Sequence, residues 1–278
     1  MAEKIQWHPG FYAGMELELR SFQLTFESEH QLTRGPLSID LLIIKKTTDQ
    51  KIDVDFAEVF RGHNIVEFKS PDDELSIDVF YKTQAYACLY KSSGETVNAI
   101  PAEEITVSLF RDTYPREMIA LLKQQGFMVE KRHSGIYQIS GPVYFVTQLI
   151  VTRELESDQH AVLRILSNHA EQADVEKFIR TTREYINSGD ASKADSVLQV
   201  SVSANKELYR KLRKEDAAVC EALKEIMKED FDEAEVRGEN RLGTLISKLF
   251  SLNRLDDAKR CATDPEFREK LYREFQLA

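Results

Sequence analysis

The sequence predicts an α/β protein with a mixed-sheet core, followed by an all-helical C-terminal region. Up to about residue 155, runs rich in β-branched and aromatic residues alternate with turn signals and with segments of helical periodicity. After that point the apolar residues follow helical spacing, and the sequence contains no obvious strand. We therefore expect an α/β domain over residues 1–155 and a helical domain over residues 156–278.

Seven runs are expected to form strands: residues 24–30, 37–45, 64–69, 105–111, 127–131, 136–139 and 143–153. Helical spacing predicts helices over residues 10–22, 75–91 and 115–125, and a short helix over 53–60 fits the pattern. The helix over 115–125 opens with a proline and closes before Gly126, as helices often do. Helices interleaved with strands in this order indicate a mixed sheet.

The helical part is expected to contain helices over residues 174–186, 193–202, 217–226 and 242–252, with a turn at 187–190. Its end could form a compact unit resembling helix-turn-helix. Five basic residues there could contact DNA phosphates: Lys259, Arg260, Arg268, Lys270 and Arg273. Acidic residues are interspersed among them, which favours a solvated face or a self-association surface over DNA reading.

Composition narrows the classes of function that fit the protein but does not select one of them. The net charge of −10, from 47 acidic and 37 basic residues, argues against a surface that coats a polyanion. An acidic enzyme can still meet nucleic acid in one metal-filled cleft. No apolar run approaches the roughly 18 residues that a membrane span requires, so no membrane partner is expected. The three cysteines are widely separated, which predicts reduced thiols and a cytoplasmic protein.

Asp40, Glu67 and Lys69 are the residues most indicative of chemistry. Glu67 and Lys69 share one face of a predicted strand, and Asp40 interrupts a neighbouring run that is otherwise apolar. If the strands are neighbours, the two carboxylates can converge on one divalent cation, with the ammonium on the same face. That arrangement suits phosphodiester hydrolysis. The alternative is structural: Glu67 and Lys69 form a solvent-facing ion pair, and Asp40 caps a turn.

Three strings add specificity: GPLSIDLLIIKK, NIVEFKSPDDELSIDVFYKTQAYACLYK and SGIYQISGPVYFVTQLIVTREL. Through them the chain resembles the PD-(D/E)XK nuclease superfamily, and more narrowly its bacterial members often labelled as putative transposases. The resemblance covers residues 35–155 and implies a restriction-endonuclease-like core of helix, three strands, helix and strand. It implies that Asp40 and Glu67 bind Mg²⁺ or Mn²⁺ and that Lys69 is the catalytic lysine. The proline of the superfamily name is missing, because Ile39 precedes Asp40.

The resemblance also implies a further acid from the first helix, for which Glu16 and Glu18 compete. Glu18 is favoured because its spacing from Phe11, Met15 and Phe22 places it on the buried stripe of the helix.

In the helix after the lysine strand, Lys82, Gln84 and Tyr86 could meet DNA phosphate or the catalytic acids, although the spacing of Tyr86 and Tyr90 is typical of core aromatics. Ser70 and Pro71 are expected to start that helix, which makes Asp72, Asp73 and Glu74 capping or solvated residues.

The sequence thus predicts a Mg²⁺- or Mn²⁺-dependent deoxyribonuclease with DNA as its partner, connected with transposition or recombination. Cutting both strands of a duplex takes two sites or two visits, which is compatible with a homodimer. The alternative is a catalytically silent nuclease fold that binds DNA or protein, and a third reading is a structural protein that meets no nucleic acid. The sequence contains no Walker loop, dinucleotide-binding glycine motif, serine elbow or HExxH motif, so the chemistries that use them lack support.

Overall fold

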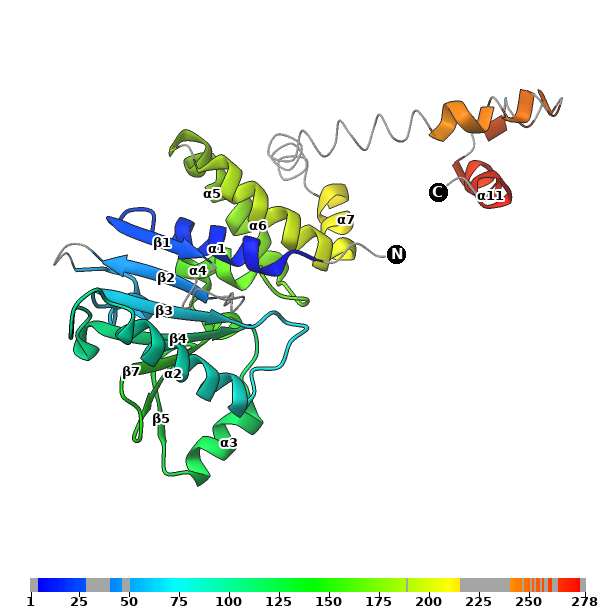
Figure 1. Cartoon of the computed structure of the whole chain (residues 1–278). Coiled ribbons are helices and arrows are strands. Elements are labelled where there is room, and N and C mark those ends of the chain that lie inside the picture. The colour runs from blue at the N-terminus through cyan, green and yellow to red at the C-terminus, as the bar shows by residue number, and fades with distance from the viewer. Residues whose placement is uncertain are drawn as a thin grey trace. The chain divides into compact units, whose positions relative to one another are not determined.

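One mixed sheet forms the centre of the structure, a computed structural model (Figure 1). The structure describes residues 5–28, 41–46, 51–188, 190–215, 241–246, 248–250, 252, 254–255, 257, 260–261 and 265–275. Within these residues seven strands lie in the spatial order β1-β2-β3-β4-β7-β6-β5. The strands are β1 Leu24–Ser28, β2 Leu41–Lys46, β3 His63–Phe68, β4 Ile105–Arg111, β5 Met128–His133, β6 Ile136–Ser140 and β7 Val146–Val151. The predicted mixed α/β fold is therefore confirmed.

The helices in the described part of the chain include α1 Trp7–Glu18, α2 Ile77–Ser92, α3 Arg116–Gln124, α4 Ser157–Arg164, α5 Gln172–Ser188, α6 Ala191–Ala204, α7 Lys206–Glu215 and α11 Pro265–Glu274. The described residues also form three short 3₁₀ turns: η1 Asp55–Ala57, η2 Ala102–Glu104 and η3 Thr152–Glu154. The turn η1 falls inside the segment for which a short helix was expected. No strand follows Val151 in the described part of the chain, in agreement with the change of pattern near residue 155.

Among the described strands, parallel pairing is confined to the middle of the sheet. Strands β1, β2 and β3 pair antiparallel, and in this register Leu41 of β2 is the partner of Glu67. Strand β3 pairs in parallel with β4, which pairs in parallel with β7, and the sheet ends in the antiparallel pairs β7–β6 and β6–β5. A parallel pair needs a crossover connection, and α2 supplies it between β3 and β4.

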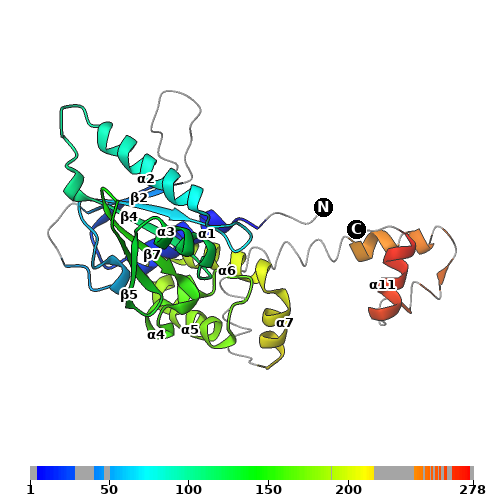
Figure 2. The same cartoon turned by 90° about the horizontal axis from the view of Figure 1, so that it is seen from below.

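Both faces of the sheet are covered by helices, with α2 on one side and α4 and α5 on the other (Figure 2). On one face, Ile65 of β3 packs in a buried cluster with Ala87 and Tyr90 of α2. On the other face, the ring of Phe68 stacks on Phe11 of α1, with ring centroids 4.1 Å apart. Strand β3 is therefore covered on both sides, and five of its six residues are buried.

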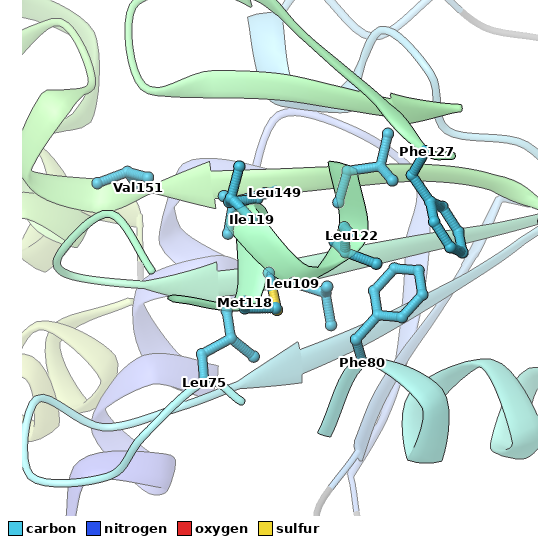
Figure 3. Close-up of a cluster of buried hydrophobic side chains, with 10 residues drawn as sticks. Leu75, Phe80, Leu109, Met118, Ile119, Leu122, Phe127, Leu149 and Val151 are labelled. Carbon is cyan, nitrogen blue, oxygen red and sulfur yellow. The ribbon is translucent and has the colours of Figure 1, made fainter. Parts of the chain in front are cut away.

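Helix α3 packs onto the same face as α2 (Figure 3). Its residues Met118, Ile119 and Leu122 are buried, and they meet Leu109 of β4 and Leu149 of β7. The helix is followed by Gly126 with φ +87°, a left-handed conformation that glycine adopts without strain. The sequence prediction of this helix and of its glycine stop is confirmed.

The helices after residue 155 divide between two compact units, Met1–Cys220 and Glu221–Ala278. In the first unit α1 packs against both α4 and α6. At Gly10 of α1 the backbones approach so closely that an added Cβ would lie 2.6 Å from Cγ2 of Val200. The boundary expected at residue 155 therefore falls inside the first unit, because α4 to α6 form the layer that covers α1.

The second unit has its own small core, formed by Leu245, Leu249, Cys261, Leu271 and Tyr272. On α11, Lys270 is exposed, and so is Arg273. Arg260 lies over the ring of Phe267, 4.3 Å from its centroid. Lys259 and the helix expected over residues 217–226 fall outside the described residues.

Candidate active site

Glu67 and Lys69 lie at the carboxyl end of β3. The backbone N–H of Lys69 donates to the carbonyl of Phe110 at 2.9 Å, which extends the parallel pairing with β4 one residue past the strand. The Lys69 ammonium lies 2.8 Å from Oε1 of Glu67. The two side chains share the face toward α2, as strand alternation predicts.

The Glu67 carboxylate is buried, with 6% of the residue exposed. Burial raises the pKa of Glu67, because the site disfavours the charged form, and the charges of Lys69, Lys82 and His8 oppose this rise. One acid thus faces two lysines and an imidazole. The excess of basic groups suits an anionic ligand such as a phosphate.

His8 is a neighbour of this site that sequence reasoning missed. It comes from the first turn of α1, and its ring meets the ring of Phe68 edge-on with centroids 5.6 Å apart. Only the docking of α1 on β3 brings His8 close to Glu67. No sequence spacing could have indicated this contact, because the two residues lie on separate elements.

The three α2 residues predicted at the site have different surroundings. Lys82 is exposed and interacts with Glu67, and its Nζ lies 5.4 Å from the ring centroid of Tyr86. Tyr86 packs against the apolar cluster between α2 and the sheet, which agrees with its core-like spacing. Gln84 is buried and donates from Nε2 to Oγ1 of Thr147 on β7 at 3.0 Å. Its Oε1 has no hydrogen-bond partner among the described residues.

Asp40 lies outside the described residues. Its chain neighbour Leu41 begins β2 and is paired with Glu67. The expected role of Asp40 as a second metal ligand therefore stays a prediction.

The structure does not bring Glu18 to Glu67. The side chain of Glu18 is buried, as its place on the apolar stripe predicts, but its Oε2 lies 3.2 Å from Nδ1 of His160 on α4. The other ring nitrogen of His160 lies 2.9 Å from Oδ1 of Asp55 in η1. Glu16, the competing acid, forms a half-exposed ion pair with Lys193 of α6 at 3.1 Å. The two acids of α1 thus form ion pairs with α4 and α6.

Charge stabilises the cluster of Glu18, His160 and Asp55. Burial alone would lower the pKa of His160, but the two carboxylates outweigh burial and raise it to about 9. Burial is also the main influence on Glu18 and raises its pKa. At Asp55 the effect of burial is outweighed by His160, so the pKa is lowered. The imidazole is therefore protonated at neutral pH and bridges two carboxylates.

Helix α2 begins later than expected. Its N-cap is Ser76, whose side chain accepts from the N–H of Val79 at 3.4 Å. Ser70 and Pro71 precede the helix in a turn, where Oγ of Ser70 donates to Oδ2 of Asp73 at 2.8 Å. The expected start at Ser70 was wrong, because a second serine closer to the apolar run of the helix supplies the cap.

Two surface hollows have volumes of about 250 and 230 Å³. Glu18 lines the first and Asp55 lines the second, and neither has Glu67 or Lys69 in its wall.

A complete metal centre is not visible in the part of the chain that the structure describes. No three His, Cys, Asp or Glu side chains there gather closely enough to hold an ion. Glu67 supplies one hard carboxylate ligand, of the type that Mg²⁺ and Mn²⁺ prefer. A metal site at Glu67 would need a second protein ligand, and Asp40 is the residue that the sequence predicts for that role.

Comparisons with known proteins assign neither a family nor a function to this chain. No family model matches the chain, and neither a curated protein nor a solved structure matches it. No helix among the described residues is both long and apolar enough to cross a bilayer. What the protein does must therefore be argued from its own residues.

Proposed function

We propose that this protein is a Mg²⁺- or Mn²⁺-dependent nuclease of the PD-(D/E)XK type that hydrolyses DNA phosphodiester bonds. The observation that carries the proposal is the buried carboxylate of Glu67 at the end of a central strand, 2.8 Å from the Lys69 ammonium. A buried acid paired with lysine, facing further basic groups from α1 and α2, is costly for stability and suited to chemistry on an anion.

Each residue has a defined task in the proposal. Glu67, with Asp40, holds the metal ion, which when bound lowers the pKa of a water molecule and neutralises phosphate charge. Lys69 orients the attacking water and stabilises the charge that develops on the phosphate. Lys82 and His8, whose charges act at Glu67, attract the negatively charged DNA backbone to the site.

The order of elements supports the same reading. Helix α1, the antiparallel strands β1 to β3, helix α2 and the parallel strand β4 follow one another in the order of the restriction-endonuclease-like core. We place the enzyme in the cytoplasm because its cysteines are few and widely separated. A role in transposition or recombination, and a homodimer that cuts both strands, belong to the same proposal.

A second candidate is a catalytically silent nuclease fold that binds DNA or protein. It is favoured by the direct ion pair, because Lys69 already compensates the charge of Glu67 without any metal. Under this candidate, DNA binding survives neutral substitutions at Glu67, and no cutting occurs with any divalent ion.

The deciding experiment is a cleavage assay with supercoiled plasmid and linear DNA in Mg²⁺, Mn²⁺ or EDTA. Wild type is compared with Asp40→Ala, Glu67→Gln and Lys69→Ala. Lys45→Ala is the matched control, because it removes a lysine that pairs with Glu27 across β1 and β2, in the same sheet. We expect metal-dependent cutting by wild type and by Lys45→Ala, none by Asp40→Ala or Glu67→Gln, and only strongly slowed, still measurable cutting by Lys69→Ala. Folded wild type that cuts nothing and binds no Mn²⁺ in calorimetry would favour the silent module.

A further inference from the structure

The turn that follows Lys69 is hydrogen-bonded to α1 and to the connection between α4 and α5. Asp72, three residues after Lys69, accepts a hydrogen bond on Oδ2 from Nε1 of Trp7 at 3.0 Å. Its other oxygen, Oδ1, accepts from Nδ2 of Asn168 at 2.8 Å. Trp7 begins α1 and is buried, whereas Asn168 lies in the connection between α4 and α5. One carboxylate thus joins three segments that are far apart in the sequence.

The connection between α4 and α5 is itself held firmly. Ser167 donates to Oδ2 of the buried Asp112, directly after β4, at 3.1 Å. Asn205, between α6 and α7, donates to the carbonyl of Ser167 at 2.7 Å and accepts from the N–H of Ala170 at 3.1 Å. Ser167 and Asn168 therefore present adjacent side chains to the acids that follow the two central parallel strands.

These contacts act on the backbone that carries the ammonium. On one side, Lys69 is tied to β4 through its N–H. On the other side the chain turns through Ser70 to Asp73, and Asp72 is its link to α1 and to Asn168. Loss of that link leaves the turn free to shift, and with it the side chain of Lys69. A shift of about 1 Å at a catalytic group can cost roughly 100-fold in rate.

We propose that Asp72 is a positioning residue that sets the place of the Lys69 ammonium, so that the helical layer α1 and α4 to α6 forms part of the catalytic unit. This inference rests on the proposed nuclease function. Asp72 itself does not touch the substrate. It acts through Lys69, with Trp7 and Asn168 as its two anchors.

The kinetic test is a double-mutant cycle in the cleavage assay. Asp72→Ala should lower kcat by about 10- to 100-fold with little change in KM. In a Lys69→Ala background the same substitution should cost nothing further, because the group that Asp72 positions is gone. Glu74→Ala is the matched control, since it removes an exposed acid two residues farther along and should leave cleavage unchanged.

Conservative variants keep the test valid if Asp72→Ala folds poorly. Trp7→Phe removes only the indole donor and retains an aromatic ring in the buried site, and Asn168→Ala removes only the second anchor. Each should lower kcat by less than Asp72→Ala does. Equal losses from Asp72→Ala with and without Lys69 would show a general structural role and overturn the inference.

A second readout is independent of cleavage, because Trp7 is the single tryptophan of the chain. Asp72→Ala should shift its emission and increase its quenching by acrylamide, whereas Glu74→Ala should change neither. Unchanged emission in Asp72→Ala would overturn the proposed contact. Absence of cleavage by wild type would overturn the nuclease proposal and the positioning role with it, whereas cleavage that Asp72→Ala leaves intact would overturn the positioning role alone.

Discussion

The imidazole Nδ1 of His160 lies 3.2 Å from the Glu18 carboxylate, although the two residues are 142 positions apart in the chain. With the partly exposed Asp55 on its other side, the buried side chain of His160 joins α1, α4 and the turn before β3 through charged contacts. A buried charge that loses its partner is strongly destabilising. This contact therefore ties the helical layer to the α/β core.

We expect His160→Gln to lower the free energy of unfolding by about 3–5 kcal/mol at pH 6, because it leaves two carboxylates without their cation. The pKa of His160 is raised from 6.5 to about 9, so its stabilising effect is complete below pH 6.5 and is lost as the pH rises through 9. Urea unfolding at pH 6 and pH 9.5 should therefore show a smaller difference between variant and wild type at the higher pH. An equal stability difference between variant and wild type at the two pH values would contradict the raised pKa of His160. Lys193→Met, which removes the more exposed ion pair with Glu16, is the control and should cost less than about 1 kcal/mol.

Glu67→Gln should keep or raise stability while it abolishes cleavage. Burial disfavours the charged carboxylate, and the neutral amide removes that cost while retaining the shape. Lys69→Met should instead lower the free energy of unfolding by about 1–3 kcal/mol, because it leaves Glu67 buried without its ion pair. Urea midpoints of both variants at pH 7 measure the contrast. A Glu67→Gln protein much less stable than wild type would indicate a structural role for the carboxylate.

Gly10→Ala should destabilise the first unit by about 1–3 kcal/mol. The new methyl would lie 2.6 Å from Cγ2 of Val200, where α1 meets α6. Gly14→Ala makes the same change one turn later, where the nearest atom is Cδ1 of Leu166 at 3.3 Å, and should cost less. Adding Val200→Ala should relieve the clash at Gly10 and recover part of the loss. Chemical denaturation of the four proteins tests the packing of these helices.

Truncation after residue 220 should leave a folded protein, whereas truncation after residue 155 should not. The shorter fragment lacks α4 and α6, which pack against α1, and it lacks His160 and Asn168. It would expose the apolar face of α1 and remove the imidazole partner of Glu18. Circular dichroism and cooperative urea unfolding of the two fragments decide the matter. A cooperatively folded 1–155 fragment would restore the domain boundary that the sequence predicts.

The strands were predictable from sequence because β-branched residues, aromatic residues and turn signals mark them locally. The shared face of Glu67 and Lys69 also follows from alternation alone. The start of α2 was not predictable in this way, since Ser70 followed by Pro71 looks like a helix start and only the fold selects Ser76.

Contacts between residues on different helices and strands could not be predicted from local sequence patterns. The spacing of α1 shows that Glu18 is buried, but His160 comes from a segment that composition assigns to another domain. The links of Asp72 to Trp7 and Asn168 likewise depend on how three elements dock. Periodicity indicates which residues are buried, whereas a site at the junction of elements depends on their arrangement in space.

The position of β4 in the sheet has a consequence for folding kinetics. The strands β1 to β3 and β5 to β7 form two sets of antiparallel neighbours connected in chain order, so each set can form through contacts that are near in sequence. Strand β4 joins them only by parallel pairs, which require longer loops to close. We therefore expect refolding to be limited by the insertion of β4, with substitutions in its Val107 and Leu109 slowing refolding more than they speed unfolding.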